Sequence, residues 1–362
     1  MTNKFNQNII ENLRKKVNGN SDFVYEQYSN VNEKNQWHII CSCMDWISVA
    51  INHLVVPKDD DSDIYKKAMD FFSIISAVDM IYESVIQLDR VFFKSKKIPF
   101  YGEDNIFSNK IFKLDDNKYF KEIRACFGAH PVNLTRDDNK WFASWPFEPF
   151  SSIDALEVRL SSNKVEIDDI TFGINSTELI EFGLSRYEYI SEIMKEIDRQ
   201  YEKFCNKYRK SSIETSTEPL KMLSILEKES KARLNNDYYN SCIDELICLF
   251  SVSCNAVELH LEETEYKREL IGVIEEIRTN LQEMKLIDLK TDSVLNPPYH
   301  HSKISYDISK LYCYLQNEKH DVLLNSYFKH LNNASENRYA MKSNDEKNIS
   351  LLKLKLFLRR LA

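Results

Sequence analysis

Apolar residues recur at spacings of three and four along most of this 362-residue chain, the pattern of amphipathic α-helices. The first clear helix is predicted over residues 35–56. The second begins near Ser62 or Asp63, both suitable N-caps, and continues to about Phe93. Pro57 and an acidic run separate the two helices, so they form an antiparallel hairpin, which is half of a four-helix bundle. Residues before this hairpin form a polar lead-in that is helical in part.

A third, short helix is predicted over Asp116–Cys126, after a connection that spans residues 94–114. Asp115 or Asp116 caps its beginning. Gly128 and Pro131 end it, because a residue that precedes proline is disfavoured in helical geometry.

The pattern changes at Trp141, where apolar and polar residues begin to alternate. Residues 156–160 read as a strand with period two. A returning strand starts at Val165 and Ile167, and a slip in its alternation indicates a bulge at 168–169. Residues 141–147 supply a third strand. We therefore expect a small β-insertion over residues 141–174.

One long helix follows, from a capping box formed by Asn175 and Glu178 to about Arg209. The expected organisation is a helical domain over 1–210, a linker over 211–217 and a second helical domain over 218–362. Helices of the second domain are predicted over 219–235, 239–261, 266–286, 304–331 and 346–361. The fold class is thus mainly α, with an N-terminal four-helix bundle that carries a β-hairpin insertion and a C-terminal helical bundle.

Composition limits the classes of function. The net charge of −8 and a pI of about 5.6 argue against a broad nucleic-acid surface, so RNA contact must come from a local basic patch. The sequence shows no apolar signal region and no run of 18 apolar residues, which predicts a cytoplasmic protein outside the membrane. The eight cysteines lack metal-ligand spacing and predict reduced thiols. No metal and no cofactor are expected.

The chemistry most readily carried by this sequence is phosphodiester cleavage by Arg124 and His130. An imidazole moves protons at a ribose hydroxyl or a leaving oxygen, and a guanidinium stabilises the phosphorane. Along a straight α-helix the two positions differ by about 240°, so a break at Gly128 and Pro131 is needed to bring them together. The predicted substrate-binding residues are basic neighbours in the sequence: Lys121, Arg136 and Lys140.

The segment Arg124-Ala-Cys-Phe-Gly-Ala-His130 resembles the R-x4-6-H signature of the HEPN superfamily. That resemblance implies a dimeric four-helix bundle and a metal-independent endoribonuclease of a toxin or antiviral defence system. It further implies attack by the ribose 2′-hydroxyl in a site that the two subunits share. Ala125 stands where the family commonly has a polar residue such as Asn.

Two alternatives remain open from the sequence. The chain is also consistent with a non-catalytic scaffold or sensor that binds a nucleotide or a protein partner, with the C-terminal domain as the protein-binding part. A group of aromatic residues over 141–150 is open to two interpretations. They either stack on single-stranded bases or pack against the bundle: Trp141, Trp145, Phe147 and Phe150. The pair His300-His301 reads more simply as a surface loop than as a metal site.

Overall fold

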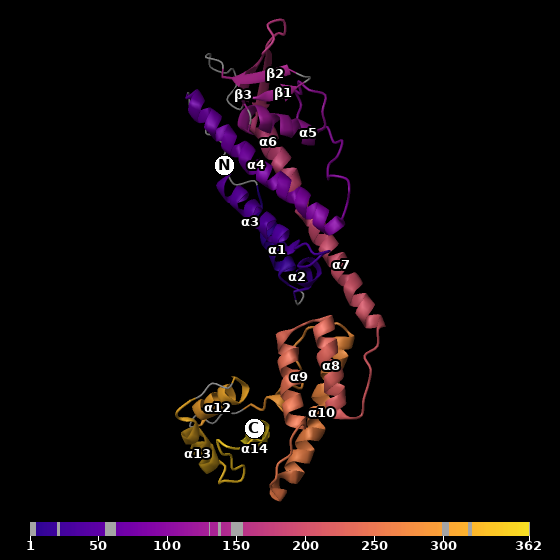
Figure 1. Ribbon diagram of the computed structural model, residues 1–362, viewed down its shortest axis with the longest axis vertical. Coiled ribbons are helices and arrows are strands. Elements are labelled where there is room, and N and C mark those ends of the chain that lie inside the picture. Colours follow the sequence, from indigo (N-terminus) through magenta and orange to yellow (C-terminus); the bar gives the residue numbers. More distant parts are fainter. Residues whose placement is uncertain are drawn as a thin grey trace. The chain divides into compact units, whose positions relative to one another are not determined.

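The computed structural model describes residues 5–19, 22–54, 63–129, 131–136, 139–145, 155–298, 304–317 and 321–361 (Figure 1). It confirms a mainly helical protein with a small antiparallel sheet. The chain divides into two compact units, Met1–Tyr201 and Glu202–Ala362.

The first unit contains both helices that hydrophobic spacing predicts most clearly. Their observed bounds are α3 (Trp37–His53) and α4 (Ile64–Phe93), and Asp63 caps α4 by accepting a bond from the backbone N–H of Tyr65. The polar lead-in holds two short helices, α1 (Gln7–Val17) and α2 (Phe23–Tyr28). The remaining helices of this unit are α5 (Asp116–Arg124), the π-helix η1 (Ala125–Ala129), α6 (Ser176–Glu188) and the first part of α7 (Ile190–Lys210).

Helix α4 is the central element of the first unit and packs against α3 and α6. Its inward face is apolar and almost inaccessible, with Phe71, Ile75 and Val78 at most 1% exposed. Among the described residues, only α4 has the length and apolar composition that crossing a membrane requires, and 61% of its apolar window is buried within the protein.

The β-insertion is a four-stranded antiparallel sheet in the order β1-β2-β3-β4. The strands are β1 (Leu134–Arg136), β2 (Asn139–Ser144), β3 (Ala155–Ser162) and β4 (Ile170–Asn175). The inward face places Val158 opposite Phe172 and Leu134 opposite Trp141. Figure 1 shows the labelled strands next to α5 and one end of α4, and the sheet shares its core with buried aromatic residues of α5 and η1.

Two sequence predictions for this sheet are wrong. Strand β1 was not expected, and the returning strand begins at Ile170 instead of Val165. Turn chemistry holds the intervening segment out of the sheet, because Ser162 Oγ accepts from Lys164 N–H and Lys164 C=O accepts from Ile167 N–H. The slip in the alternation therefore marks the end of a loop and not a bulge.

The long helix predicted from Asn175 to Arg209 is two helices, α6 and α7, with a break at Tyr189. The Tyr189 hydroxyl donates to Asp89 on α4 at 2.8 Å, a contact that ties the break to the bundle. Asn175 caps α6 through Thr177 N–H as expected. Glu178 does not complete a capping box, because its carboxylate binds the backbone and hydroxyl of Ser108.

The described residues of the second unit form helices and connecting loops, without a strand. Its elements are α8 (Pro219–Arg233), α9 (Asp237–Phe250), the 3₁₀ turn η2 (Val257–Leu259), α10 (His260–Gln282), α11 (Asp292–Leu295), α12 (Ser305–Asn317), α13 (Leu324–Ala334) and α14 (Lys347–Leu361). The helices predicted over 239–261 and 304–331 are therefore each interrupted. Residues 211–217 form no helix, and Arg233 and Gln282 bind their backbone. The division between the units lies at Tyr201, inside α7.

Candidate functional site

Arg124 is the last residue of α5, a helix that begins where the Asp115 carboxylate accepts a bond from Lys118 N–H at 2.9 Å. Its Nε lies 3.0 Å from a carboxylate oxygen of Asp79 on α4. The Arg124 side chain is 47% exposed, and that of Asp79 is 17% exposed. The guanidinium is therefore open to solvent on one side and paired with an acid on the other.

The chain leaves Arg124 as a π-helix, η1, which replaces the last α-helical turn of the prediction. Cys126 and Phe127 of this turn are buried, and a Cβ added at Gly128 would lie 3.6 Å from the Phe72 ring on α4. Because a π-helix bonds residue i to i+5, the straight-helix rotation of about 240° does not apply after Arg124. His130 and the side chain of Arg136 lie outside the described residues, so the geometry of both remains a prediction.

The other two predicted phosphate-binding cations lie on different elements. Lys121 is exposed on α5, one turn before Arg124, with its Nζ 5.9 Å from the centre of the Tyr82 ring. Lys140 is on β2, where its Nζ donates to the side chains of Asn133 and Thr135 at 3.0 Å each. The structure thus brings Lys121 to the side of α5 that carries Arg124, and it holds Lys140 on the outer face of the sheet.

The acid that binds Arg124 is electrostatically disfavoured in its charged form. Burial is the main cause and raises the pKa of Asp79. Glu83 adds to this effect, whereas Arg124 and Lys121 act in the opposite direction. The second carboxylate oxygen of Asp79 is buried and has no hydrogen-bond partner among the described residues. One Asp79 oxygen therefore carries the contact with Arg124.

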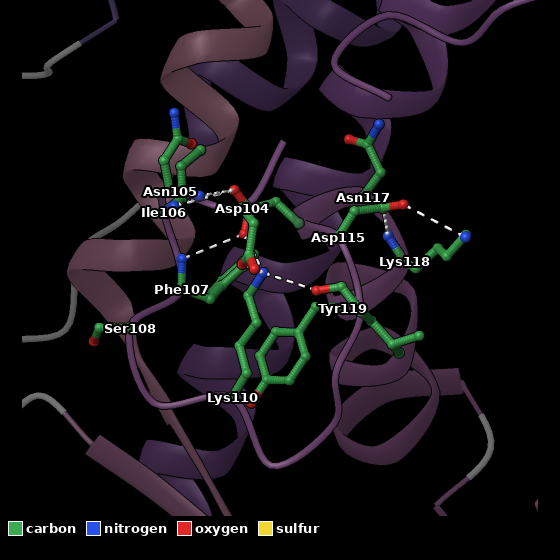
Figure 2. A network of polar contacts seen from close by, with 12 residues as sticks. Asp104, Asn105, Ile106, Phe107, Ser108, Lys110, Asp115, Asn117, Lys118 and Tyr119 are labelled. Carbon is green, nitrogen blue, oxygen red and sulfur yellow. Dashed lines mark hydrogen bonds and ion pairs between the residues drawn. The ribbon is translucent and has the colours of Figure 1, made fainter. Parts of the chain in front are cut away.

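The sequence predicts only a possible capping role for Asp116. In the structure Asp116 binds the backbone of the connection before α5. Its fully buried carboxylate accepts from the backbone N–H groups of Asn105 and Ile106 at 2.9 and 3.0 Å. Lys110 lies 2.6 Å away and also pairs with Asp104 (Figure 2). Burial opposes ionisation, but these donors outweigh it and hold the pKa of Asp116 below its usual range.

A second buried charge, Arg186 on α6, fixes α5 against α6. Its guanidinium lies 3.8 Å from the centre of the Phe182 ring and 4.4 Å from that of Phe100. It donates to the Asn117 side chain at 2.8 Å, and Asn117 in turn donates to Pro99 C=O at 2.9 Å. Burial lowers the pKa of Arg186 to about 10. No periodic signal marks this residue, because its partners come from three separate segments.

A cavity of about 230 Å³ lies between the sheet and the turn that follows Arg124. Trp141 lines it and is 8% exposed, yet its indole Nε1 has no hydrogen-bond partner among the described residues. Of the other aromatic residues proposed for base stacking, Trp145 packs near Phe127 with ring centres 6.4 Å apart. Phe147 and Phe150 lie outside the described residues.

The described residues hold no group of three or more His, Cys, Asp or Glu side chains that is suited to a metal ion. His300 and His301 lie outside those residues. None of the eight cysteines forms a disulfide, and five of them are buried.

Comparisons with protein-family models, with curated proteins and with solved structures find no match for this chain.

Proposed function

We propose that this protein is a metal-independent endoribonuclease of a defence or toxin–antitoxin system, acting in the cytoplasm. In this proposal Arg124 binds the scissile phosphate, and His130 transfers a proton as the ribose 2′-hydroxyl attacks. The observation that carries the proposal is the state of Arg124. Its guanidinium is half exposed at a helix end and directly precedes an irregular turn that leads to His130.

The ion pair with Asp79 suits a cation that exchanges partners. Because burial raises the pKa of Asp79, this carboxyl group takes up a proton at a higher pH than a solvated acid does, and the neutral form attracts Arg124 less than the charged form. A phosphodiester offers two anionic oxygens to the guanidinium fork. Substrate therefore displaces Asp79 from Arg124, and Lys121 adds positive charge on the same side of α5.

The π-helix supports a functional role for this turn. Such turns are rare, appear mostly as single turns within α-helices and frequently occur at functional sites. Here the π-helical turn spans Ala125–Ala129, which are the residues between Arg124 and His130 in the sequence. The imidazole is the natural proton carrier near neutral pH, and the pair needs no metal ion for the transfer.

An exposed apolar face on α3 and α4 is a suitable surface for a second copy of the chain. Ile39, Trp46 and Val49 on α3 are 38%, 51% and 45% exposed. A groove of about 390 Å³, lined in part by Trp46 and by Glu83, runs between the two helices. Exposed aromatic and aliphatic side chains grouped in this way mark interaction surfaces.

The angular positions of residues around α4 place this apolar face on the same side of the helix as Asp79, the partner of Arg124. Phe72, which is 41% exposed, and Asp79 are seven residues apart and so differ by about 20° around the helix. Asp79 therefore points to the same side of α4 as the apolar surface. A twofold dimer through this surface would place the two Arg124 side chains near the symmetry axis, as a shared site requires.

A non-catalytic scaffold or sensor is the second candidate. The observation that favours it is the same Arg124–Asp79 pair, because an ion pair between α5 and α4 also has a purely structural use. In that case the groove beside Trp46 or the C-terminal unit binds a protein partner, and the turn after Arg124 has no chemical role.

Incubation of the full-length protein with end-labelled RNA in EDTA distinguishes the two candidates. The variants are Arg124→Ala, His130→Ala and the control Arg199→Ala, which removes an exposed arginine that is ion-paired with Glu196. The proposal expects cleavage to 2′,3′-cyclic phosphate ends by the wild type and the control. Each of the other two variants should lose at least 100-fold in rate. Intact RNA with the wild type, or cleavage that neither substitution affects, would refute the nuclease.

A further inference from the structure

The cavity beneath the turn that follows Arg124 is built from three parts of the first unit. Phe112 comes from the connection before α5, and Cys126 comes from η1. The inward face of the sheet supplies one side chain from each strand, and these are Leu134, Trp141, Leu160 and Ile170. Most of the lining is therefore apolar, and the cavity is enclosed by elements that also form the core.

The buried Nε1 of Trp141 is the unusual group in this lining. A buried indole N–H normally finds an acceptor, because leaving it unpaired costs the full penalty of its desolvation. Trp141 is held in the middle of the sheet by pairing with Leu134 on β1 and Ser162 on β3, so its ring position is set by the fold. An unpaired buried donor on a residue that lines a preformed cavity suits a ligand that brings its own acceptor.

The more exposed end of the cavity is polar. Glu122 on α5 is partly exposed and lines the cavity together with Asn133 and Thr135. A carboxylate has about four acceptor positions, so Glu122 can receive N–H groups of a ligand beside its contacts within the protein. Lys140, on the outer face of the sheet, donates to the side chains of both Asn133 and Thr135.

We propose that this cavity binds one nucleobase of the RNA substrate, with guanine preferred. The buried edge of the base accepts a bond from Trp141 Nε1, and the neighbouring ring N–H and amino groups at the opposite edge of guanine donate to the Glu122 carboxylate. Phe112 and Leu160 contact the faces of the ring. The inference rests on the proposed endoribonuclease, because it assigns the base that lies next to the phosphate at Arg124.

The closeness of the cavity-lining residues to Arg124 along the chain supports this assignment. Ala125 and Cys126 line it and directly follow Arg124, whose guanidinium turns instead toward Asp79 on α4. A nucleotide has a similar arrangement, because its base and its phosphate lie on different sides of the sugar. The base can therefore lie in the cavity while the phosphate lies at Arg124. The apolar lining and limited volume fit a single flat ring system and exclude a folded RNA element, which the exposed surface would have to bind.

Titration of the ¹⁵N-labelled full-length protein with nucleosides tests the proposal without requiring catalysis. The indole N–H signals of the four tryptophans are observed, and Trp141→Phe assigns the signal of interest. Guanosine should move the Trp141 signal downfield in a saturable manner, while the signal of Trp46 stays in place. Adenosine, uridine and cytidine should bind at least fivefold more weakly than guanosine. Toluene, which has no acceptor, should cause no comparable downfield shift.

Three variants make the outcome decisive. Trp141→Phe keeps an aromatic ring but removes the donor, and it should weaken guanosine binding about tenfold. Ile170→Phe fills the cavity from the sheet and should abolish binding, and it provides a second measurement if Trp141→Phe does not fold. Arg124→Ala leaves the cavity lining intact and should still bind guanosine. The nuclease can therefore fail while the base site stands, or the reverse.

The proposal is overturned if no nucleoside moves the Trp141 signal, or if toluene shifts it downfield as much as guanosine does. It is also overturned if adenosine binds as tightly as guanosine, because the Glu122 carboxylate would then not read the base edge.

Discussion

The buried carboxylate of Asp116 should be worth several kcal/mol to the first unit, and the substitution Asp116→Ala tests this value. The carboxylate satisfies two backbone N–H groups at 2.9 and 3.0 Å and pairs with Lys110 at 2.6 Å. Breaking a buried ion pair by removing one partner costs about 3–5 kcal/mol. Because Lys110 retains its contact with Asp104, we expect a loss near the lower end, about 3 kcal/mol.

The measurement must report on the first unit alone, because a chain with two units need not unfold in one step. Hydrogen exchange at the backbone amides of the buried helix α4 meets this need, because these groups belong to the core of the first unit and the substitution does not remove their own hydrogen bonds. The control is Asp104→Ala, which removes an exposed partner of Lys110 and should cost less than about 1 kcal/mol. If both substitutions change protection equally, or Asp116→Ala costs under about 1 kcal/mol, the ranking of these contacts is incorrect.

The pH dependence gives a second check on Asp116. Its pKa is lowered in the folded protein, so its contribution to stability is present above the unfolded-state pKa near 3.8 and is lost as the pH falls through the lower folded-state pKa. The stability difference between the wild type and Asp116→Ala should therefore shrink in strong acid. A difference that stays constant down to the acid transition would contradict the assignment.

Three further substitutions have definite expected outcomes. Because the pKa of Asp79 is raised in the folded protein, protonation of Asp79 stabilises the fold as the pH falls through that pKa, and this gain is lost as the pH rises. Asp79→Asn should remove this pH dependence of thermal unfolding. The same substitution should lower the KM for RNA severalfold. Trp46→Asp should convert a dimer to a monomer in sedimentation experiments while changing monomer stability by less than about 0.5 kcal/mol, whereas a dimer that persists would show that another surface pairs the copies. Arg186→Lys should cost about 2 kcal/mol in urea unfolding, because an ammonium cannot stack between Phe100 and Phe182, and an unchanged midpoint would contradict this.

The sequence predicts those helices and strands in which the spacing of apolar residues repeats several times. Helices α3 and α4 follow from their apolar spacing, and β3 follows from strict alternation. Strand β1 has three residues, too few for any period to appear. The break at Tyr189 was missed because the apolar spacing of three and four continues across it, while the contact with Asp89 that accompanies it comes from a distant helix.

The candidate site shows the same contrast: some of its residues are marked by their neighbours in the sequence, and others only by contacts between distant segments. Arg124 is a candidate from the sequence because a charged residue beside a Gly, a His and a Pro is a local signal. Asp116, Arg186 and the unpaired Nε1 of Trp141 gain their meaning from partners, or from the lack of them, in segments far apart in the chain. Asp116 and Asp115 are equivalent as candidate helix caps in the sequence, yet only Asp115 caps α5, while Asp116 turns inward to bind the connection.

The π-helix joins the two proposals physically. Arg124 precedes it and pairs with Asp79 on α4, while Ala125 and Cys126 line the cavity beside the sheet. A base that fills the cavity would contact η1 directly, and η1 is continuous with Arg124, the residue proposed to bind the phosphate. Occupation of the cavity should therefore alter the Arg124–Asp79 pair. In the Asp79→Asn protein, guanosine should then move the Arg124 side-chain signal less than it does in the wild type, because no ion pair remains to be broken.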